Sequence, residues 1–239
     1  HAMTLRGWTN EADRPTWNGI WSEKLLVCDN VIGDFDEGID SLQVASQNGG
    51  DAARHRNVIV ERNFIKSHLN TCIITEVSDN MTIRSNICTT DGAAYAIEVV
   101  YNSTVSAPQP VNTKIYNNTV WKTTNASYNG FSAIYCTSNT SGTLIANNLG
   151  YAPADTRDGL TNGSAPTFIC GSGSYSLVGG NSTDSQVKNT KPWASTSPSA
   201  YADYSPNSYG INGGVAVPVM KDFFNATITG SREIGAIQV

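Results

Sequence analysis

Residues 57–67 read "NVIVERNFIKS", and three later stretches follow the same pattern. They are "NMTIRSNICTT" from Asn80, "NTKIYNNTVWKT" from Asn112 and "GTLIANNLGYAP" from Gly142. Each stretch alternates apolar residues with others, reaches an asparagine and then continues with apolar residues. Such period-2 alternation predicts short β-strands, and its recurrence along the chain predicts a repeat architecture.

The repeats align on the asparagine that closes each stretch. The aligned residues are Asn30, Asn63, Asn86, Asn118, Asn148 and Asn181. Three positions earlier lies an aliphatic residue in every repeat: Val27, Val60, Ile83, Ile115, Ile145 and Val178. Five positions earlier lie Leu25, Val58, Met81, Thr113, Thr143 and Ser176, and two positions later lie Ile32, Ile65, Cys88, Val120, Gly150 and Thr183. A second alternating phrase centres on Ile20, Ile39, Ile73, Ile97, Ile134 and Ile169.

One strand–turn–strand unit of this length cannot bury an inner face alone, whereas stacked units form a continuous core. Asparagine tolerates the left-handed αL conformation, so we predict that the recurrent asparagine is the turn residue. Stacked asparagines can also hydrogen-bond one another along the stack. We therefore expect an all-β fold, a single-stranded solenoid of parallel strands with about six coils. A propeller blade would need four strands per repeat, for which the interval from Asn63 to Asn86 has no room.

The pattern divides the chain into two parts. Residues 1–183 are predicted to form the coils, with residues 1–17 holding a tag remnant, "HAM", and a degenerate first coil. Residues 184–239 are rich in Pro, Ser and Tyr and lose the repeat, so we expect an irregular C-terminal cap that closes the stack.

Composition limits the classes of function. The net charge of −5 argues against nucleic acid as a partner, and no apolar run is long enough to insert into a membrane. The five cysteines, which contain no CxxC spacing, are Cys28, Cys72, Cys88, Cys136 and Cys170. We predict buried free thiols that act as small hydrophobic groups, with a disulfide between stacked strands as the alternative.

Two insertions, 47–56 and 101–110, leave the repeat at the same point before the asparagine. A short third coil lies between them. This placement predicts a groove over coils two to four, and loops on a rigid scaffold are common binding sites.

The phrases "EGIDSL", "NVIVERNFI" and "NMTIRSNIC" resemble the right-handed parallel β-helix superfamily of pectate lyases, polygalacturonases and phage tailspikes. The closing "SPNSYGINGG" and "REIGAIQV" are similar to the ends of many secreted bacterial β-helix proteins. The resemblance implies a right-handed β-helix, a secreted or cell- or virion-surface location and a polysaccharide partner. It does not imply one activity, because the NTD, DD, GHG and RIK series and the vWIDH and RxPxxR motifs are absent from the sequence.

Two cleavage chemistries match the charged residues. A glycoside hydrolase needs two carboxylates about 5–10 Å apart, and Asp36 or Asp40 with Glu76 would supply them. A polysaccharide lyase needs a base for the proton beside a uronate carboxylate, and a cation that neutralises this carboxylate. The residues suited to that work are Arg62, Lys66, His68 and Arg84. Asp36, Glu37 and Asp40 are candidate Ca²⁺ ligands, and Ca²⁺ is the one cofactor that the sequence raises.

Other residues are candidates for substrate binding. They are Arg54, His55, Arg56, Glu98, Trp121 and Tyr151. Trp121 and Tyr151 share one register on adjacent coils, so they form either a sugar-stacking platform or a hydrophobic lid. Glu61 and Arg84 also share a register, which predicts an ion pair between neighbouring coils.

The alternative function is a non-catalytic, tailspike-like or surface module that binds carbohydrate, either as a monomer or as part of a trimer. An enzyme should have convergent charged groups on the floor of its groove. A binding or structural module should instead have its charges paired with one another.

Overall fold

The computed structural model describes the following residues: 3–6, 21–33, 42–45, 54–67, 71–76, 78–90, 95–100, 110–122, 132–136, 141–151, 167–170, 174–177, 182–183, 199–206, 214, 216–218, 221–230 and 235–238. Within these ranges the fold is all-β and contains no α-helix, although one short 3-10 helix, η2 (Tyr201–Tyr204), is present. All pairings between the strands are parallel.

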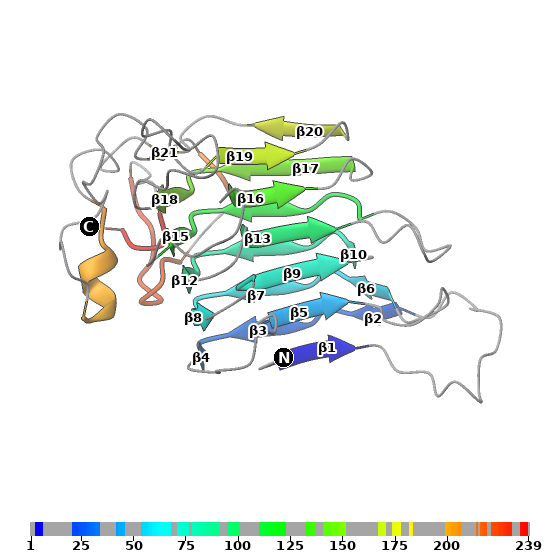
Figure 1. The fold of residues 1–239 in the computed structure, drawn as a ribbon, viewed down its shortest axis with the longest axis horizontal. Coiled ribbons are helices and arrows are strands. Elements are labelled where there is room, and N and C mark those ends of the chain that lie inside the picture. The colour runs from blue at the N-terminus through cyan, green and yellow to red at the C-terminus, as the bar shows by residue number, and fades with distance from the viewer. Residues whose placement is uncertain are drawn as a thin grey trace.

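The strands form four sheets, which Figure 1 shows as parallel arrows stacked along one axis. Sheet A contains β1 (Met3–Arg6), β5 (Leu42–Ala45), β9 (Ile73–Glu76), β13 (Tyr95–Val100), β16 (Ser132–Cys136) and β19 (Thr167–Cys170). Sheet B contains β3 (Leu26–Cys28), β7 (Ile59–Glu61), β11 (Thr82–Arg84), β14 (Lys114–Tyr116), β17 (Ser141–Ala146) and β20 (Ser174–Leu177). Sheet C contains β4 (Val31–Ile32), β8 (Phe64–Ser67), β12 (Ile87–Thr90), β15 (Thr119–Lys122), β18 (Leu149–Tyr151) and β21 (Ser182–Thr183). A minor sheet contains β2 (Trp21–Glu23), β6 (Arg54–Arg56) and β10 (Ser78–Asp79).

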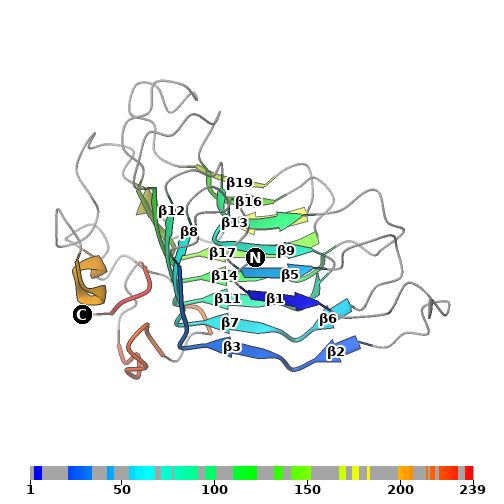
Figure 2. The same ribbon diagram turned by 60° about the horizontal axis from the view of Figure 1, so that its bottom comes forward.

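The strands of the three large sheets follow one another along the chain in a constant order. A strand of sheet B is followed by one of sheet C and then by one of sheet A, as in β7, β8 and β9. Neighbours within a sheet therefore come from successive passes of the chain, which Figure 2 shows from a second direction. This arrangement confirms the predicted all-β, solenoid-like stack of parallel strands.

The predicted core register is confirmed through the first five repeats. Val27 pairs with Val60, and the same row continues through Ile83, Ile115 and Ile145. All five side chains are buried, and together with a second inner row that includes Ile65 and Val120 they form one continuous core. In the sixth repeat the predicted alignment of Val178 is wrong, because Leu177 pairs with Ile145.

The predicted alignment of the second phrase is correct in the middle of its row and wrong at both ends. Ile73, Ile97 and Ile134 pair in one buried row, as predicted. Phe168 rather than Ile169 continues this row, and at its start Leu42 rather than Ile39 pairs with Ile73. The pairings of β16 with β19 and of β17 with β20 each contain a register shift. Such an irregularity offsets one strand by a residue, which an alignment of evenly spaced repeats does not detect. Ile20, Ile39 and Asn181 lie outside the described residues.

The aligned asparagines form a continuous hydrogen-bonded ladder. The side-chain Nδ2 of each donates to Oδ1 of the next, over 2.9 Å from Asn30 to Asn63 and 3.0 Å for the links that continue through Asn86, Asn118 and Asn148. The backbone N–H of each also donates to the same Oδ1. Further donation from Nδ2 reaches backbone carbonyls, such as Val60 O and Arg84 O from Asn86. The ladder is buried beyond Asn30, and its amides satisfy the polar groups that the bend would otherwise leave without partners.

The predicted location of the turn conformation is wrong by one residue. Positive φ angles occur at the residue before each ladder asparagine: Asp29, Arg62, Ser85, Asn117 and Asn147. A second set occurs six residues before the ladder, at Lys24, Asn57, Asn80, Asn112 and Gly142. The strands β3, β7, β11 and β14 of sheet B therefore each lie between two αL bends. The ladder residue contributes its side chain to the fold, while a neighbour supplies the strained backbone.

The described C-terminal residues pack along the side of the stack where sheets B and C meet. Gly235 N–H donates to Asn147 O, Asn117 Nδ2 donates to Gly235 O, and Ala236 N–H donates to Thr119 Oγ1. Figure 1 shows this segment in orange and red beside β12, β15 and β18. The predicted closure of an end of the stack falls partly on residues outside the described ranges and stays a prediction.

Aromatic residues seal the same contact. The Tyr204 ring lies between Phe64 and Trp121, with centroids 6.1 and 5.9 Å away, and the Tyr201 ring lies 4.8 Å from Phe64. Burial raises the pKa of Tyr204, and it also raises the pKa of Tyr116 on sheet B. Both phenols are therefore held in the neutral form by the fold.

We expect Asn86→Leu to lower the free energy of unfolding by about 3 kcal/mol, because it leaves the backbone N–H of Asn63 without its acceptor and removes the Nδ2 donor from the carbonyl oxygens of Val60 and Arg84. Asn30→Leu, at the half-buried first position of the ladder, should cost only about 1 kcal/mol. Urea unfolding followed by circular dichroism measures both values. Equal losses in the two variants would contradict the ladder as the source of stability.

Stability should also fall at alkaline pH. The folded pKa of Tyr204 is raised, so its contribution is present below the ordinary tyrosine pKa of about 10 and is lost as the pH rises above that value. Tyr204→Phe removes this titrating group and should give a smaller loss of stability between neutral and alkaline pH. Phe64→Leu, which weakens the same packing, should lower stability without changing its pH dependence. An unchanged pH dependence in Tyr204→Phe would contradict this assignment.

Candidate functional site

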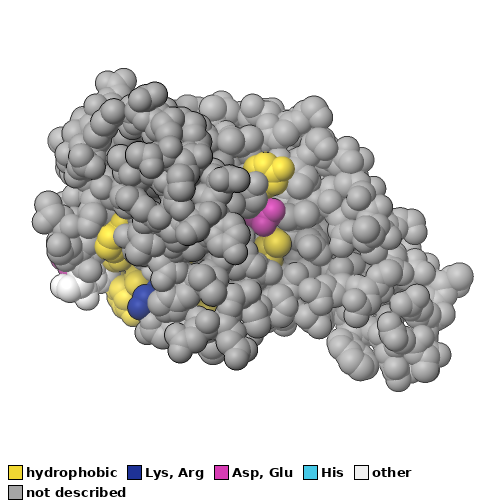
Figure 3. Space-filling view, in the orientation of Figure 1, with side chains coloured by type: hydrophobic (Ala, Val, Ile, Leu, Met, Phe, Trp, Pro, Cys, Tyr) yellow, Lys and Arg dark blue, Asp and Glu magenta, His cyan; other side chains and the backbone are white. Residues whose placement is uncertain are grey.

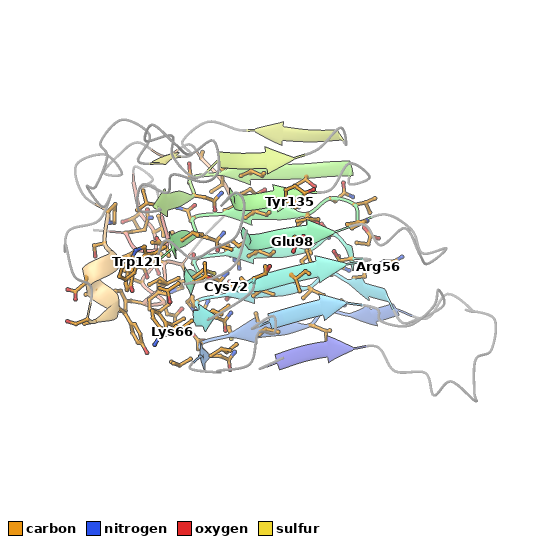
Figure 4. All side chains as sticks on the ribbon, viewed as in Figure 1. Arg56, Lys66, Cys72, Glu98, Trp121 and Tyr135 are labelled. Atoms are coloured by element: carbon orange, nitrogen blue, oxygen red, sulfur yellow. The ribbon has the colours of Figure 1, made fainter. Side chains whose placement is uncertain are left out.

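The outer face of sheet A carries a row of dissimilar side chains. Glu98 pairs with Ile74 on one side and with Tyr135 on the other. Figure 3 shows one magenta carboxylate between two yellow side chains at this place, and Figure 4 labels Glu98 and Tyr135 on neighbouring strands. Glu98 and Tyr135 are half-buried, whereas Ile97 and Ile134, which precede them, are fully buried on the inner face. Strand alternation thus directs this row to the outside.

The carboxylate of Glu98 has a fixed neighbour. Thr71 Oγ1, on a residue with 1% exposure, donates a hydrogen bond of 3.4 Å to Glu98 Oε2. The carboxylate of Glu98 offers a hydrogen-bond acceptor, and the Tyr135 ring beside it offers an apolar face. Both residues lie on a sheet whose inner face is fully packed. This row is the candidate functional site.

The register also places Glu76 relative to Glu98. Glu76 pairs with Val100, two residues beyond Glu98 on β13, so both glutamates belong to the same face of sheet A. The strand spacing and rise put their Cα atoms about 8 Å apart. Asp40, which was predicted to act with Glu76, lies outside the described residues, as does the side chain of Glu76.

A network of ion pairs lies on sheet B and its bend. Arg84 Nε donates to Glu61 Oε2 over 2.7 Å, which confirms the predicted pair. Arg62 also binds Glu61, and its Nε and Nη2 donate to the two oxygens of Asp29 over 2.8 and 2.9 Å. The hydrogen bond from Arg62 lowers the pKa of Asp29, while burial raises the pKa of the neighbouring Cys28 thiol.

These contacts bear on the proposed catalytic cations. Arg62 and Arg84 are bound to carboxylates at the edge of sheet B, and Arg84 Nη1 donates to Pro218 O of the C-terminal segment over 3.1 Å. Neither arginine lies on sheet A with Glu98. Lys66 lies on a third surface, the outer face of sheet C, where Figure 4 labels it. Of the described basic residues of the predicted set, Arg62 and Arg84 therefore meet at Glu61, whereas Lys66 lies on a different surface.

The basic run at residues 54–56 was predicted to end an insertion loop, and this is wrong. Arg54, His55 and Arg56 form strand β6, which pairs with β2 and β10. Arg56 Nε lies 3.2 Å from Asp79 Oδ2, and Figure 4 shows Arg56 at the far end of the molecule from Lys66. The side chains of Arg54 and His55 lie outside the described part. Three consecutive polar residues carry no apolar alternation, so the sequence offered no strand signal here and its charges made the run resemble a loop.

The predicted register of Trp121 and Tyr151 is confirmed on sheet C. Trp121 is half-buried and packs against Tyr204, so in the described residues it belongs to the contact with the C-terminal segment. Lys66 and Thr89 share its row. The side chain of Tyr151 lies outside the described part.

Sequence reasoning missed Tyr135 and Thr71. The signal for Tyr135 was present, because it directly follows the core residue Ile134 and must therefore face outward. No signal in the sequence connects Thr71 with Glu98, since 27 positions separate them.

Asp36, Glu37, Asp40 and His68 lie outside the described residues. Within the described part, no group of three or more His, Cys, Asp or Glu side chains could hold a metal ion. The same part includes no helix with the length and apolar character needed to cross a membrane. Comparison of the chain with models of protein families, with curated proteins and with solved structures gave no match in any of the three.

We expect Arg84→Met to lower the free energy of unfolding by about 2 kcal/mol, because it removes a partner of the buried Glu61 and a contact with Pro218. Limited proteolysis should also cut the C-terminal segment faster. Lys114→Met removes a charge from the same sheet at a half-buried position and should change stability by no more than about 0.5 kcal/mol. If the two variants behave alike, Arg84 does not anchor the segment.

Proposed function

We propose that this protein binds a polysaccharide along the outer face of sheet A, with Tyr135 and Glu98 as contacts. The observation that carries the proposal is their pairing in register on adjacent strands. An aromatic ring offers an apolar face to the C–H groups of a sugar ring, and a carboxylate accepts hydrogen bonds from sugar hydroxyls. The packed row of Ile73, Ile97 and Ile134 beneath them keeps this surface rigid, so little side-chain freedom is lost on binding.

The fold proposal that accompanies this function is a right-handed, single-stranded parallel β-helix of six coils with a C-terminal cap. It is supported by the six strands in each of sheets A, B and C and by the constant order of these sheets along the chain. The resemblance of the repeat phrases to secreted β-helix proteins supports a secreted or surface location. A stack of this kind presents a flat row of equivalent positions, which suits an extended, repeating ligand.

A second candidate function is hydrolysis of the bound polysaccharide. The observation that favours it is the shared face of Glu76 and Glu98, since paired carboxylates about 5–10 Å apart are the machinery of glycoside hydrolysis. One would act as acid, and the other as base or nucleophile. Lyase chemistry through Arg62 and Arg84 has less support, because both arginines are bound to Glu61 and Arg62 also binds Asp29.

We expect Tyr135→Ala to weaken binding to a recognised polysaccharide by about tenfold, because the ring loses its stacking contact. Affinity electrophoresis against a panel of neutral and acidic polysaccharides identifies the ligand and measures the change. Tyr201→Ala removes an exposed aromatic ring from the C-terminal segment and should leave binding unchanged. Equal loss in both variants would move the site to the C-terminal segment, and a folded protein that binds no member of the panel would refute the proposal.

The same polysaccharides distinguish binding from cleavage. Hydrolysis would be established by two results together. The unmodified chain would release reducing ends, and both Glu76→Gln and Glu98→Gln would lose this release while they still bind the polysaccharide. New ultraviolet absorbance from an unsaturated uronate would instead identify a lyase. Binding without either product would leave the non-catalytic module as the function.

A further inference from the structure

Two cysteines lie opposite each other in sheet A. Cys136, the last residue of β16, pairs with Cys170, the last residue of β19. Figure 1 shows these two strands side by side near the upper end of the stack. Residues in register on adjacent strands have Cα atoms about 4.8 Å apart and belong to the same face of the sheet. A disulfide requires Cα atoms about 4.4–6.8 Å apart, so the backbone spacing fits.

The other strand cysteines have different neighbours. Cys28 pairs with Glu61, and Cys88 lies between Ile65 and Val120. Cys28, Cys72 and Cys88 are free thiols. Among the described strand pairings, the match between Cys136 and Cys170 is therefore the one that sets two cysteines in register.

We propose that Cys136 and Cys170 form a disulfide that joins β16 to β19. Cys136 also pairs with Val99, which is fully buried and pairs in turn with the buried Thr75. The bond would thus belong to an inner row of the stack, where folding brings the two thiols together and keeps reductants away. It would close the loop 137–169 and would lie next to Tyr135, fixing the strand that carries this residue.

The oxidant is a small or protein disulfide of an oxidising compartment, which the proposed extracellular location supplies. One cysteine thiolate attacks a sulfur of that disulfide and releases one thiolate, forming a mixed disulfide. The second cysteine thiolate attacks the protein sulfur of the mixed bond and releases the other thiolate. The two cysteines lose two protons and two electrons, and the oxidant becomes two thiols.

In the experiment that tests this proposal, the full chain is refolded with reduced and oxidised glutathione. The result therefore does not depend on the natural location of the protein. The product is denatured, alkylated with iodoacetamide before or after reduction, and analysed by peptide mass spectrometry. We expect labels on Cys28, Cys72 and Cys88 before reduction and on Cys136 and Cys170 only after it. Direct labelling of Cys136 and Cys170, a glutathione adduct on either, or a bond to another cysteine would overturn the proposal.

Thermal unfolding provides a second measurement. The melting temperature of the oxidised protein should fall when a reductant is added, because the cross-link restricts the unfolded chain. Cys136→Ala should abolish this response to the reductant. The matched core variant Cys88→Ala should lower the melting temperature but should still respond to the reductant. A response that persists in Cys136→Ala would assign the redox effect to another cysteine pair.

Discussion

The asparagine ladder is the constraint on which the rest of the structure depends. A chain that bends sharply at the same place on every pass leaves backbone N–H and C=O groups inside the bend, where water does not reach them. The amides from Asn30 to Asn148 satisfy these groups and bond to one another, so each pass is held in register with the next. A shift by one residue would break the ladder and would also turn the aliphatic rows toward solvent. Polar and apolar requirements therefore specify the same alignment.

The bends also decide which surfaces remain for a ligand. Paired αL positions give sheet B two fixed ends, and Ser85, Asn117 and Asn147 at its bend with sheet C bond to the C-terminal segment. Tyr204 and Ile237 from that segment then cover apolar residues on the outside of sheet C. The described contacts of the segment are to sheets B and C and to the bend between them. Within the described residues, sheet A is therefore the large sheet that the segment leaves uncovered.

Charge has a different role on each surface. On sheet B, Glu61 and Arg84 form part of a partly buried network that links neighbouring passes and the C-terminal segment. Pairs of this kind fix geometry, and removing one partner is costly because the other remains buried. On sheet A, Glu98 lies between an aliphatic and an aromatic side chain, with a threonine hydroxyl bound to one oxygen. The first arrangement links parts of the fold, and the second is the basis of the binding proposal.

The sequence by itself determined the repeat, the strands of the repeated phrases, the ladder asparagines and the core rows through Ile145, because strand alternation and stacking are local properties repeated along the chain. It also predicted the neighbours Glu61 and Arg84, which follow from the register alone. Only the tertiary structure decided that the αL residues precede the ladder, that Leu177 replaces Val178 in the core row, and that the segment around Tyr204 lies along the side of the stack. The pairing of Cys136 with Cys170 and the contact of Thr71 with Glu98 were likewise decided there. Register irregularities and contacts between distant residues depend on how whole passes fit together, and no single repeat encodes that fit.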